Sequence, residues 1–187
     1  MFGLQDVRTA LQHIGWHCGG QIREKLLLLE RRAGREIIGP VESSFFVEAH
    51  EGVEASLRAT LHIVRQCCLT ETNGSAFLEC VLKRTKAPLA RAALRELLAD
   101  EVDHARIGWG WLARAGNEVR RRVVQHLPSL IESHLAMWRP RSHHESTPTL
   151  VAHGYPPSDA IDEAVLGAVD DIILPGFAQM GMKRSGA

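Results

Sequence analysis

The helical period of residues 89–115 is the strongest constraint that the sequence places on the fold. Small and apolar side chains recur at spacings that place them on one face of an α-helix: Leu94, Leu97, Gly108 and Leu112. Pro88 precedes the segment and Gly116 follows it, as is typical of the first turn and the end of a helix. A helix of this length needs other helices to cover its apolar face, so we expect a bundle.

The rest of the chain shows the same period. Further helices are predicted over residues 4–18, 21–33, 47–83, 118–138 and from 159 to near Pro175. Gly74 is expected to bend or widen its helix, and Pro128 to kink or divide another. No segment shows the sustained alternation of apolar and polar residues that is typical of a strand. We therefore predict an all-α, antiparallel helical bundle with extra C-terminal helices.

The order of these segments predicts one compact domain with appendages. Its expected parts are a divergent N-terminal helical segment (1–46), a core bundle part (47–139), a surface linker (140–157), and a C-terminal helix with its tail (158–187). The linker is expected from its prolines, histidines and lack of period.

Composition excludes several classes of partner. The 187 residues carry a formal net charge of zero, so no global field attracts nucleic acid or an anionic membrane. No apolar run approaches the roughly 18 to 20 residues that cross a bilayer, and no secretion signal is recognisable. The four cysteines lack a Cys-x-x-Cys spacing and are expected to be small buried residues in a reducing compartment. We expect a cytoplasmic protein that binds neither nucleic acid nor membranes.

Glu101 and His104 lie on the same predicted stripe as the leucines of residues 89–115. This placement is costly unless something compensates, because a buried carboxylate needs a partner, a proton or a metal ion. The alternative is that the helix is slightly rotated and that Glu101 and His104 are an exposed polar pair.

Glu71 is expected to face this pair. Glu71 lies 17 positions before Pro88 and Glu101 lies 13 after it, on helices that the turn makes antiparallel. At about 1.5 Å per residue these are depths of roughly 25 and 20 Å, within one helical turn of each other. Glu71, Glu101 and His104 would then offer three ligands for iron, manganese or zinc.

Two sequence segments carry a resemblance to a known family. Residues 64–72, V-R-Q-C-C-L-T-E-T, and the later A-D-E-V-D-H-A-R-I-G-W around Glu101 resemble the second helical pair of the ferritin-like, rubrerythrin-related di-iron proteins. Residues 152–155 and the helix through Pro175 are similar to the C-terminal extension of that family. The resemblance covers roughly residues 55 to 176.

This resemblance implies a ferritin-like bundle in which Glu71 is the single-carboxylate ligand and Glu101 and His104 form the Glu-x-x-His pair. The implied cofactor is iron, with two ions in a complete site, and manganese is the alternative. The implied chemistry is oxidation of ferrous ions or activation of oxygen or peroxide. Whether the chain is an enzyme therefore depends on whether the site is complete.

A complete site of this family has a second glutamate and a second Glu-x-x-His, but His104 belongs to the only Glu-x-x-His in this chain. Two copies could complete the site as a homodimer across a two-fold axis. Irregular ligands could come from four residues at the predicted start of the long helix, namely Glu48, His50, Glu51 and Glu54. A solvated helix start is the simpler interpretation of these residues. A first helical pair could also precede Met1. Otherwise the site is degenerate and the protein is a metal-free helical scaffold or interaction protein.

Overall fold

A computed structural model describes residues 52–138 and 154–182, and these residues contain helices and no strand. The elements, in chain order, are α3 (Ala55–Ile63), η1 (Val64–Thr70), α4 (Glu71–Arg84), α5 (Pro88–Arg114), α6 (Asn117–Val124), α7 (Leu127–Trp138), α9 (Ser158–Ala168), η2 (Val169–Ile173) and α10 (Leu174–Gln179). The two η elements are π-helical turns. The all-α prediction is confirmed for the described residues, whereas the predicted helices of residues 4–18 and 21–33 lie outside them.

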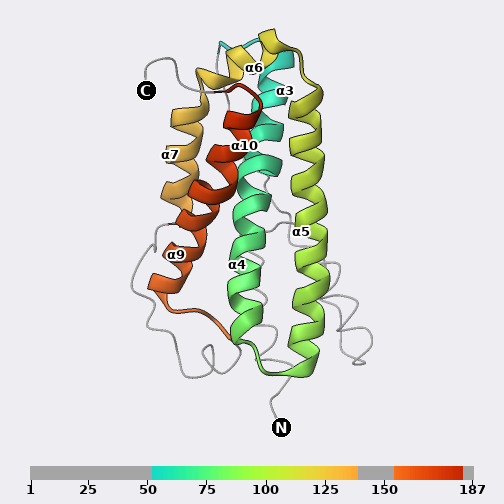
Figure 1. Ribbon diagram of the computed structural model, residues 1–187, viewed down its shortest axis with the longest axis vertical. Helices are drawn as coiled ribbons and strands as arrows, with labels where there is room; N and C mark the ends of the chain where they lie inside the picture. Colours follow the sequence, from blue (N-terminus) through green and yellow to red (C-terminus); the bar gives the residue numbers. More distant parts are fainter. Residues whose placement is uncertain (1–51, 139–153, 183–187) are drawn as a thin grey trace.

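A long helical hairpin dominates the fold (Figure 1). The elements α3, η1 and α4 form one continuous rod, and α5 returns antiparallel beside it after the turn at residues 85–87. The Arg91 guanidinium stabilises this turn by donating hydrogen bonds of 2.8 Å to the carbonyl oxygens of Leu82 and Thr85. These carbonyls at the end of α4 have no partner within the helix, so Arg91 provides the missing donor.

The first rod begins later than predicted. Residues 52–54 are not helical, and α3 starts at Ala55 instead of near Val47. Gly52 has a φ of 75°, a left-handed conformation that breaks a right-handed helix and that glycine adopts without strain. Residues 47–51 lie outside the described part of the chain.

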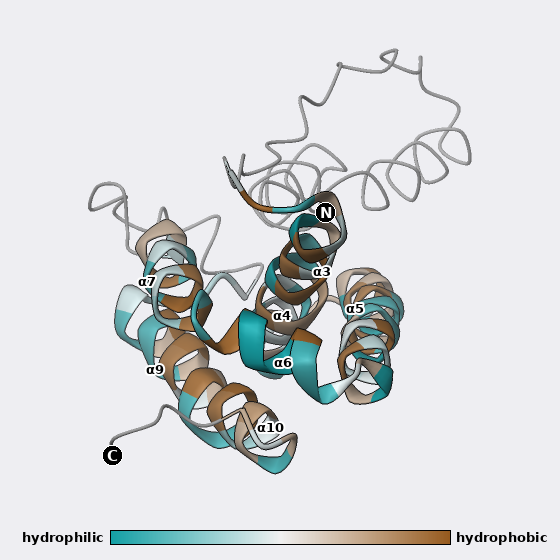
Figure 2. Cartoon of the chain, turned by 90° about the horizontal axis from the view of Figure 1, so that it is seen from above, coloured by the Kyte–Doolittle hydropathy of each residue, from teal (hydrophilic) through white to brown (hydrophobic). Residues whose placement is uncertain are grey.

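Of the remaining helices, α7 and α9 lie beside the first rod on the side away from α5, whereas α6 crosses the end of the bundle next to α3 (Figures 1 and 2). Pro128 divides the predicted helix 118–138 into α6 and α7, as expected, because it lies in the first turn of α7, where no backbone N–H is needed. Apolar residues lie mainly on the sides of the helices that face one another. The largest fully buried side chains of the main core are Leu61, Leu69, Leu112, Leu130, Ile173 and Phe177.

The end of the predicted surface linker is packed, contrary to expectation. Gly154 is buried against Thr85 at the end of α4, and a Cβ atom at Gly154 would lie 2.2 Å from the Thr85 Oγ1 atom. Gly154 also has a φ of 87°, so both contact and backbone conformation require glycine. Residues 139–153 of the linker are outside the described ranges.

The C-terminal helix continues past Pro175, where we predicted its end, to Gln179. The π-turn η2 explains the difference, because its last hydrogen bond runs from the Leu174 N–H to the Val169 carbonyl oxygen. Pro175 then occupies the first turn of α10, where its missing N–H costs little.

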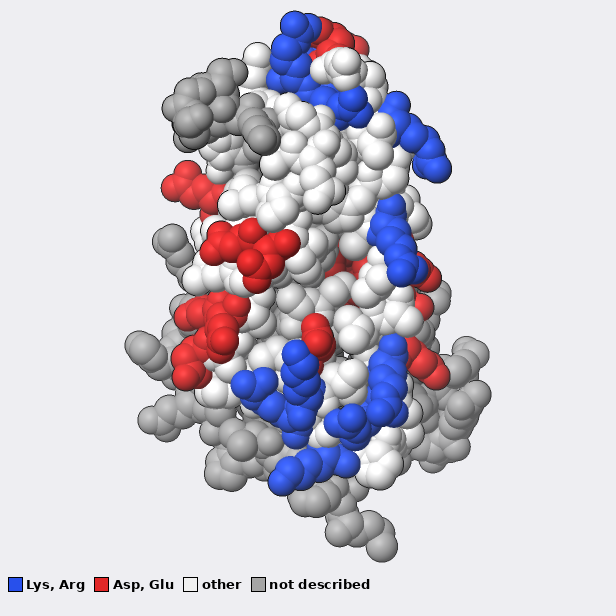
Figure 3. Space-filling view, in the orientation of Figure 1, with Lys and Arg blue, Asp and Glu red and all other residues white. Residues whose placement is uncertain are grey.

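Charged side chains gather by sign on the face drawn in Figure 3. Acidic residues follow α9 and η2, and basic residues surround the turn between α4 and α5. The helix dipole favours acidic residues at the start of α9 and basic residues at the end of α4. None of the helices within residues 52–138 and 154–182 combines the length and the apolar character needed to span a membrane.

Candidate metal centre

The three predicted ligands meet between the two long helices. Glu71 is the first residue of α4, and Glu101 and His104 lie on the facing side of α5. One ligand atom from each side chain lies within 4.8 Å of the others. The convergence predicted from helix depth is thus confirmed, and among the described residues these three form the group whose geometry fits a metal ion.

Both carboxylates are buried. Glu101 is 2% exposed and Glu71 is 8% exposed, whereas the His104 side chain retains 30% exposure. The alternative in which Glu101 and His104 are an exposed pair is therefore wrong for Glu101. His104 lies at the edge of the cluster, between the carboxylates and solvent.

One of the two carboxylate oxygens of Glu101 lacks a hydrogen bond. Its Oε2 atom is buried without a hydrogen-bond partner among the described residues, and Nδ1 of His104 lies 3.5 Å from it. An unsatisfied buried oxygen of this kind carries a desolvation cost. The donor set of two carboxylates and one imidazole fits a cation such as iron, manganese or zinc, which would remove this cost.

Glu71 holds a proton unusually well. Burial raises the pKa of its carboxyl group to about 8, and the hydrogen bond with Glu101 and the charge of Glu101 act in the same direction. A hydrogen bond from Gln66 and the neighbouring His104 partly oppose this rise in the pKa. The two carboxylates thus share one proton or one cation more readily than they remain as two separate anions.

A π-turn precedes Glu71, and the sequence did not predict it. We predicted a bend or widening at Gly74, but Gly74 lies within the regular helix α4, and the widened turn is η1. In η1 the Glu71 N–H bonds to the carbonyl oxygen of Gln66, five residues earlier. The Gln66 side chain donates a second hydrogen bond, of 2.8 Å, to Oε1 of Glu71.

The two long helices approach closely one turn from this cluster. A Cβ atom at Gly108 would lie 2.3 Å from the Cβ of Cys67, so only glycine fits there. Gly108 follows His104 by four residues and Cys67 precedes Glu71 by four, so this contact fixes the separation of the ligand-bearing faces. The small Gly108 in an otherwise leucine-rich stripe is a sequence signal that could have indicated this approach.

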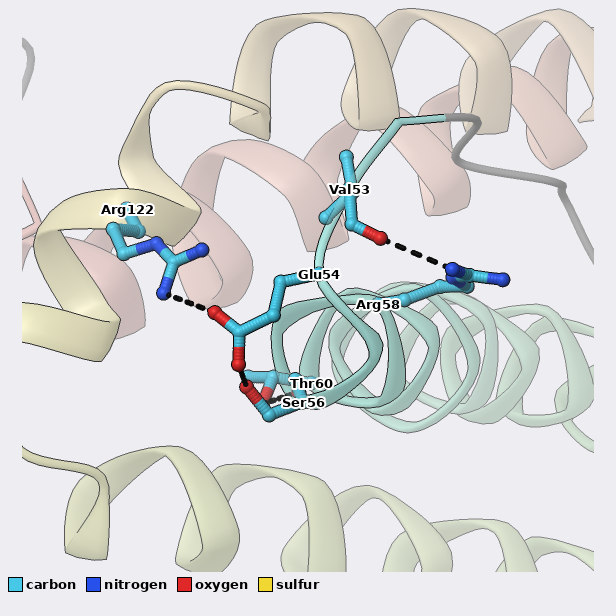
Figure 4. A network of polar contacts seen from close by, with 6 residues as sticks. All are labelled: Val53, Glu54, Ser56, Arg58, Thr60 and Arg122. Carbon is cyan, nitrogen blue, oxygen red and sulfur yellow. Dashed lines mark hydrogen bonds and ion pairs between the residues drawn. The ribbon is translucent and has the colours of Figure 1, made fainter.

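Glu54 belongs to a different network, shown in Figure 4. Its carboxylate accepts hydrogen bonds from Arg122, at 3.0 Å, and from Ser56, at the start of α3. Glu54 is exposed and lies 17 residues before Glu71, about 25 Å along the rod. The solvated helix start is therefore the correct interpretation of Glu54, and an irregular ligand is the wrong one. Glu48, His50 and Glu51 are outside the described residues.

A second buried polar cluster was not predicted. The side chains of Asn73 and His134 are fully buried, and Nδ2 of Asn73 lies 2.8 Å from Nε2 of His134. The Trp138 indole N–H donates to the same nitrogen at 3.1 Å. Because both neighbours are donors, Nε2 is the acceptor and the proton of the neutral imidazole is on Nδ1. This cluster joins α4 to α7.

Comparisons of the chain with protein-family models, with curated proteins and with solved structures found no match. These comparisons therefore assign no family to the chain.

Proposed function

We propose that this chain binds a transition-metal ion through Glu71, Glu101 and His104, with iron as the first candidate and manganese as the second. The observation that carries the proposal is the burial of two carboxylates beside one imidazole, with Oε2 of Glu101 lacking a hydrogen bond among the described residues. A divalent cation would neutralise the carboxylates and give that oxygen a partner.

The chemistry of the donors supports these metals. Carboxylate oxygens and imidazole nitrogens suit iron and manganese, whereas thiolates would favour softer ions. Burial raises the pKa of the nearby Cys68 thiol to about 12, so Cys68 stays protonated and is a poor ligand at neutral pH. The resemblance to ferritin-like di-iron proteins favours iron over zinc and a ferritin-like arrangement for the whole bundle.

We propose a ferroxidase-like or oxygen-activating reaction for a complete centre, in which the bound metal supplies the redox chemistry. The chain's own contribution is to hold the carboxylates, to keep water from Glu101, and to leave His104 at the accessible edge. Three ligands leave coordination positions open, so we propose that a second copy of the chain faces them across a two-fold axis. The free thiols of Cys67, Cys68 and Cys80 are consistent with a cytoplasmic setting.

Metal analysis of purified protein tests the proposal. Wild-type protein, reconstituted anaerobically with Fe²⁺ and separately with Mn²⁺, is expected to retain metal after desalting. Glu101→Gln and His104→Ala are expected to lose nearly all of it. The matched controls are Glu96→Gln, on the exposed side of α5, and His62→Ala, exposed on α3, which should retain wild-type metal content. Oxygen consumption after addition of Fe²⁺ then measures the redox reaction.

The competing function is that of a metal-free helical scaffold. The observation in its favour is the pKa of Glu71, because a carboxyl group with a pKa of about 8 is mostly protonated at pH 7 and needs no cation. Equal metal content in the wild type, Glu101→Gln and His104→Ala would support the scaffold and overturn the metal proposal.

A further inference from the structure

Gln66 connects the buried cluster to the surface. The residue is exposed on the rod, yet its side-chain amide donates a 2.8 Å hydrogen bond to Oε1 of the buried Glu71. The amide therefore contacts one of the three candidate ligands without being a candidate ligand itself.

This contact depends on the π-turn. In a regular α-helix, residues five apart point about 140° away from each other, so Gln66 and Glu71 would lie on different faces. In η1 the backbone bonds run between residues five apart, and the Glu71 N–H bonds to the carbonyl oxygen of Gln66. In the same π-turn, the Thr70 hydroxyl donates a hydrogen bond of 3.1 Å to the carbonyl oxygen of Arg65, which is also five residues earlier. The widened turn thus places Gln66 directly over Glu71.

The position of this turn is fixed by its neighbours. Gly108 of α5 packs against Cys67, the residue next to Gln66, so closely that no side chain fits between them. On another side of the rod, the Arg65 guanidinium donates to Oγ of Ser133 on α7, at 3.3 Å. Contacts on both sides of Gln66 therefore hold the turn against α5 and α7.

We infer that Gln66 is a positioning residue of the proposed metal centre, whose amide fixes the orientation of the Glu71 carboxylate through a contact that only the π-turn permits. The inference rests on the proposed function. The last torsion of a free glutamate side chain is broad, so an unheld Glu71 carboxylate would sample several orientations. Hydrogen bonds to ligating carboxylates commonly change metal affinity by about 10- to 100-fold.

The test compares Gln66→Met, which keeps the length of the side chain but removes the donor, with wild type. The matched control is Gln125→Met, at an exposed glutamine that follows α6. Affinity for Co²⁺ or Mn²⁺ is measured by competition with a chelator, and the visible absorption of bound Co²⁺ reports the ligand geometry. Thermal unfolding of the metal-free proteins measures any general loss of structure.

Gln66→Met is expected to weaken metal binding by about 10- to 100-fold and to change the Co²⁺ spectrum, with little change in the melting temperature of the metal-free protein. Gln125→Met should leave the metal affinity, the Co²⁺ spectrum and the melting temperature unchanged. If wild type and Gln66→Met bind metal with the same affinity and give the same Co²⁺ spectrum, the positioning role of Gln66 is refuted, whereas the proposed metal site is not. If the wild type takes up no metal, both the metal site and the role of Gln66 are overturned.

Discussion

The carboxylates of Glu71 and Glu101 are both buried, and one ligand atom of each lies within 4.8 Å of the other. Two anions so close cannot both remain ionised away from water without a counter-charge. The protein therefore holds either a proton or a cation between them, and the choice between the two depends on pH and on metal supply. Metal binding would release the proton of Glu71, because the ligand must be deprotonated.

The stability of the metal-free protein is expected to fall as pH rises from about 4.5 to about 8. The Glu71 pKa is near 4.5 in the unfolded chain and about 8 in the folded one. Between these values the folded state binds the proton and the unfolded state does not, so raising the pH favours unfolding. The loss amounts to a few kcal/mol, at about 1.4 kcal/mol per unit of pKa difference. Urea unfolding in the presence of a chelator, repeated along this pH range, measures it.

Glu71→Gln is the control for this pH dependence, because an amide of the same shape has no proton to lose. As pH rises from about 4.5 to about 8, the unfolding free energy of the wild type should fall relative to that of Glu71→Gln. Above about pH 8 the difference between the two proteins should become constant. Parallel curves for the two proteins would show that Glu71 titrates at its ordinary pKa and that the carboxylates do not share a proton.

His134 is expected to stabilise the fold strongly. His134→Ala would leave the buried Asn73 amide and the Trp138 indole without their common acceptor. Each buried unsatisfied group costs about 1–3 kcal/mol, so the total expected loss is roughly 3–5 kcal/mol once the missing ring is included. Urea unfolding measures the loss, and His62→Ala, at an exposed histidine, should change stability by less than about 0.5 kcal/mol. A loss below about 1 kcal/mol in His134→Ala would contradict the shared acceptor.

At the scale of elements, the contact between η1 and α5 sets the geometry of the cluster. Gly108→Ala is expected to destabilise the protein by about 1–3 kcal/mol, because the new methyl group overlaps Cys67, despite the better helix propensity of alanine. The helices must then separate one turn from His104, so metal uptake should weaken as well. Thermal unfolding and metal analysis measure the two effects.

Gly110→Ala is the matched substitution on the same helix. The nearest atom to a Cβ at Gly110 is the flexible end of Arg114, at 3.7 Å, so a methyl group fits there. Gly110→Ala should therefore stabilise the protein by up to about 1 kcal/mol through helix propensity alone. If Gly108→Ala also stabilises the protein, the close approach of the helices is wrong.

The sequence predicted the described helices, apart from some of their ends, and the convergence of Glu71, Glu101 and His104. The apolar period locates helices because burial selects it, and the turn before Pro88 forces α4 and α5 to run antiparallel, so depth along each helix could be counted. The π-turns could not be predicted, because residues 64–70 have an ordinary helical spacing of apolar side chains. The hydrogen bond between Asn73 and His134 could not be predicted either, because the two residues are 61 positions apart in sequence and no local pattern relates them.

At the scale of the whole molecule, the described helices would supply three ligands of the proposed metal centre, and a second copy of the chain would complete it. His104 is the ligand with the most exposed side chain, and the side of α5 that extends from it carries Ile107 and Trp111, which are 65% and 50% exposed. Residues 104, 107 and 111 share one side of a helix through spacings of three and four. If two copies share the centre, this is the side on which they meet.

Ile107→Asp is therefore expected to convert an associated wild-type protein to monomers and to reduce its metal content in parallel, because charge at a buried interface opposes association. Leu89→Asp is the matched control, since Leu89 is 53% exposed on the same helix but lies far from His104. Sedimentation velocity combined with metal analysis of each species provides the measurement. A wild-type monomer that binds a full pair of metal ions would refute the shared centre, and so would an Ile107→Asp protein that remains associated and loaded. If Ile107→Asp loses both association and metal while Leu89→Asp keeps both, the result would support a centre in which a second copy of the chain supplies the remaining ligands.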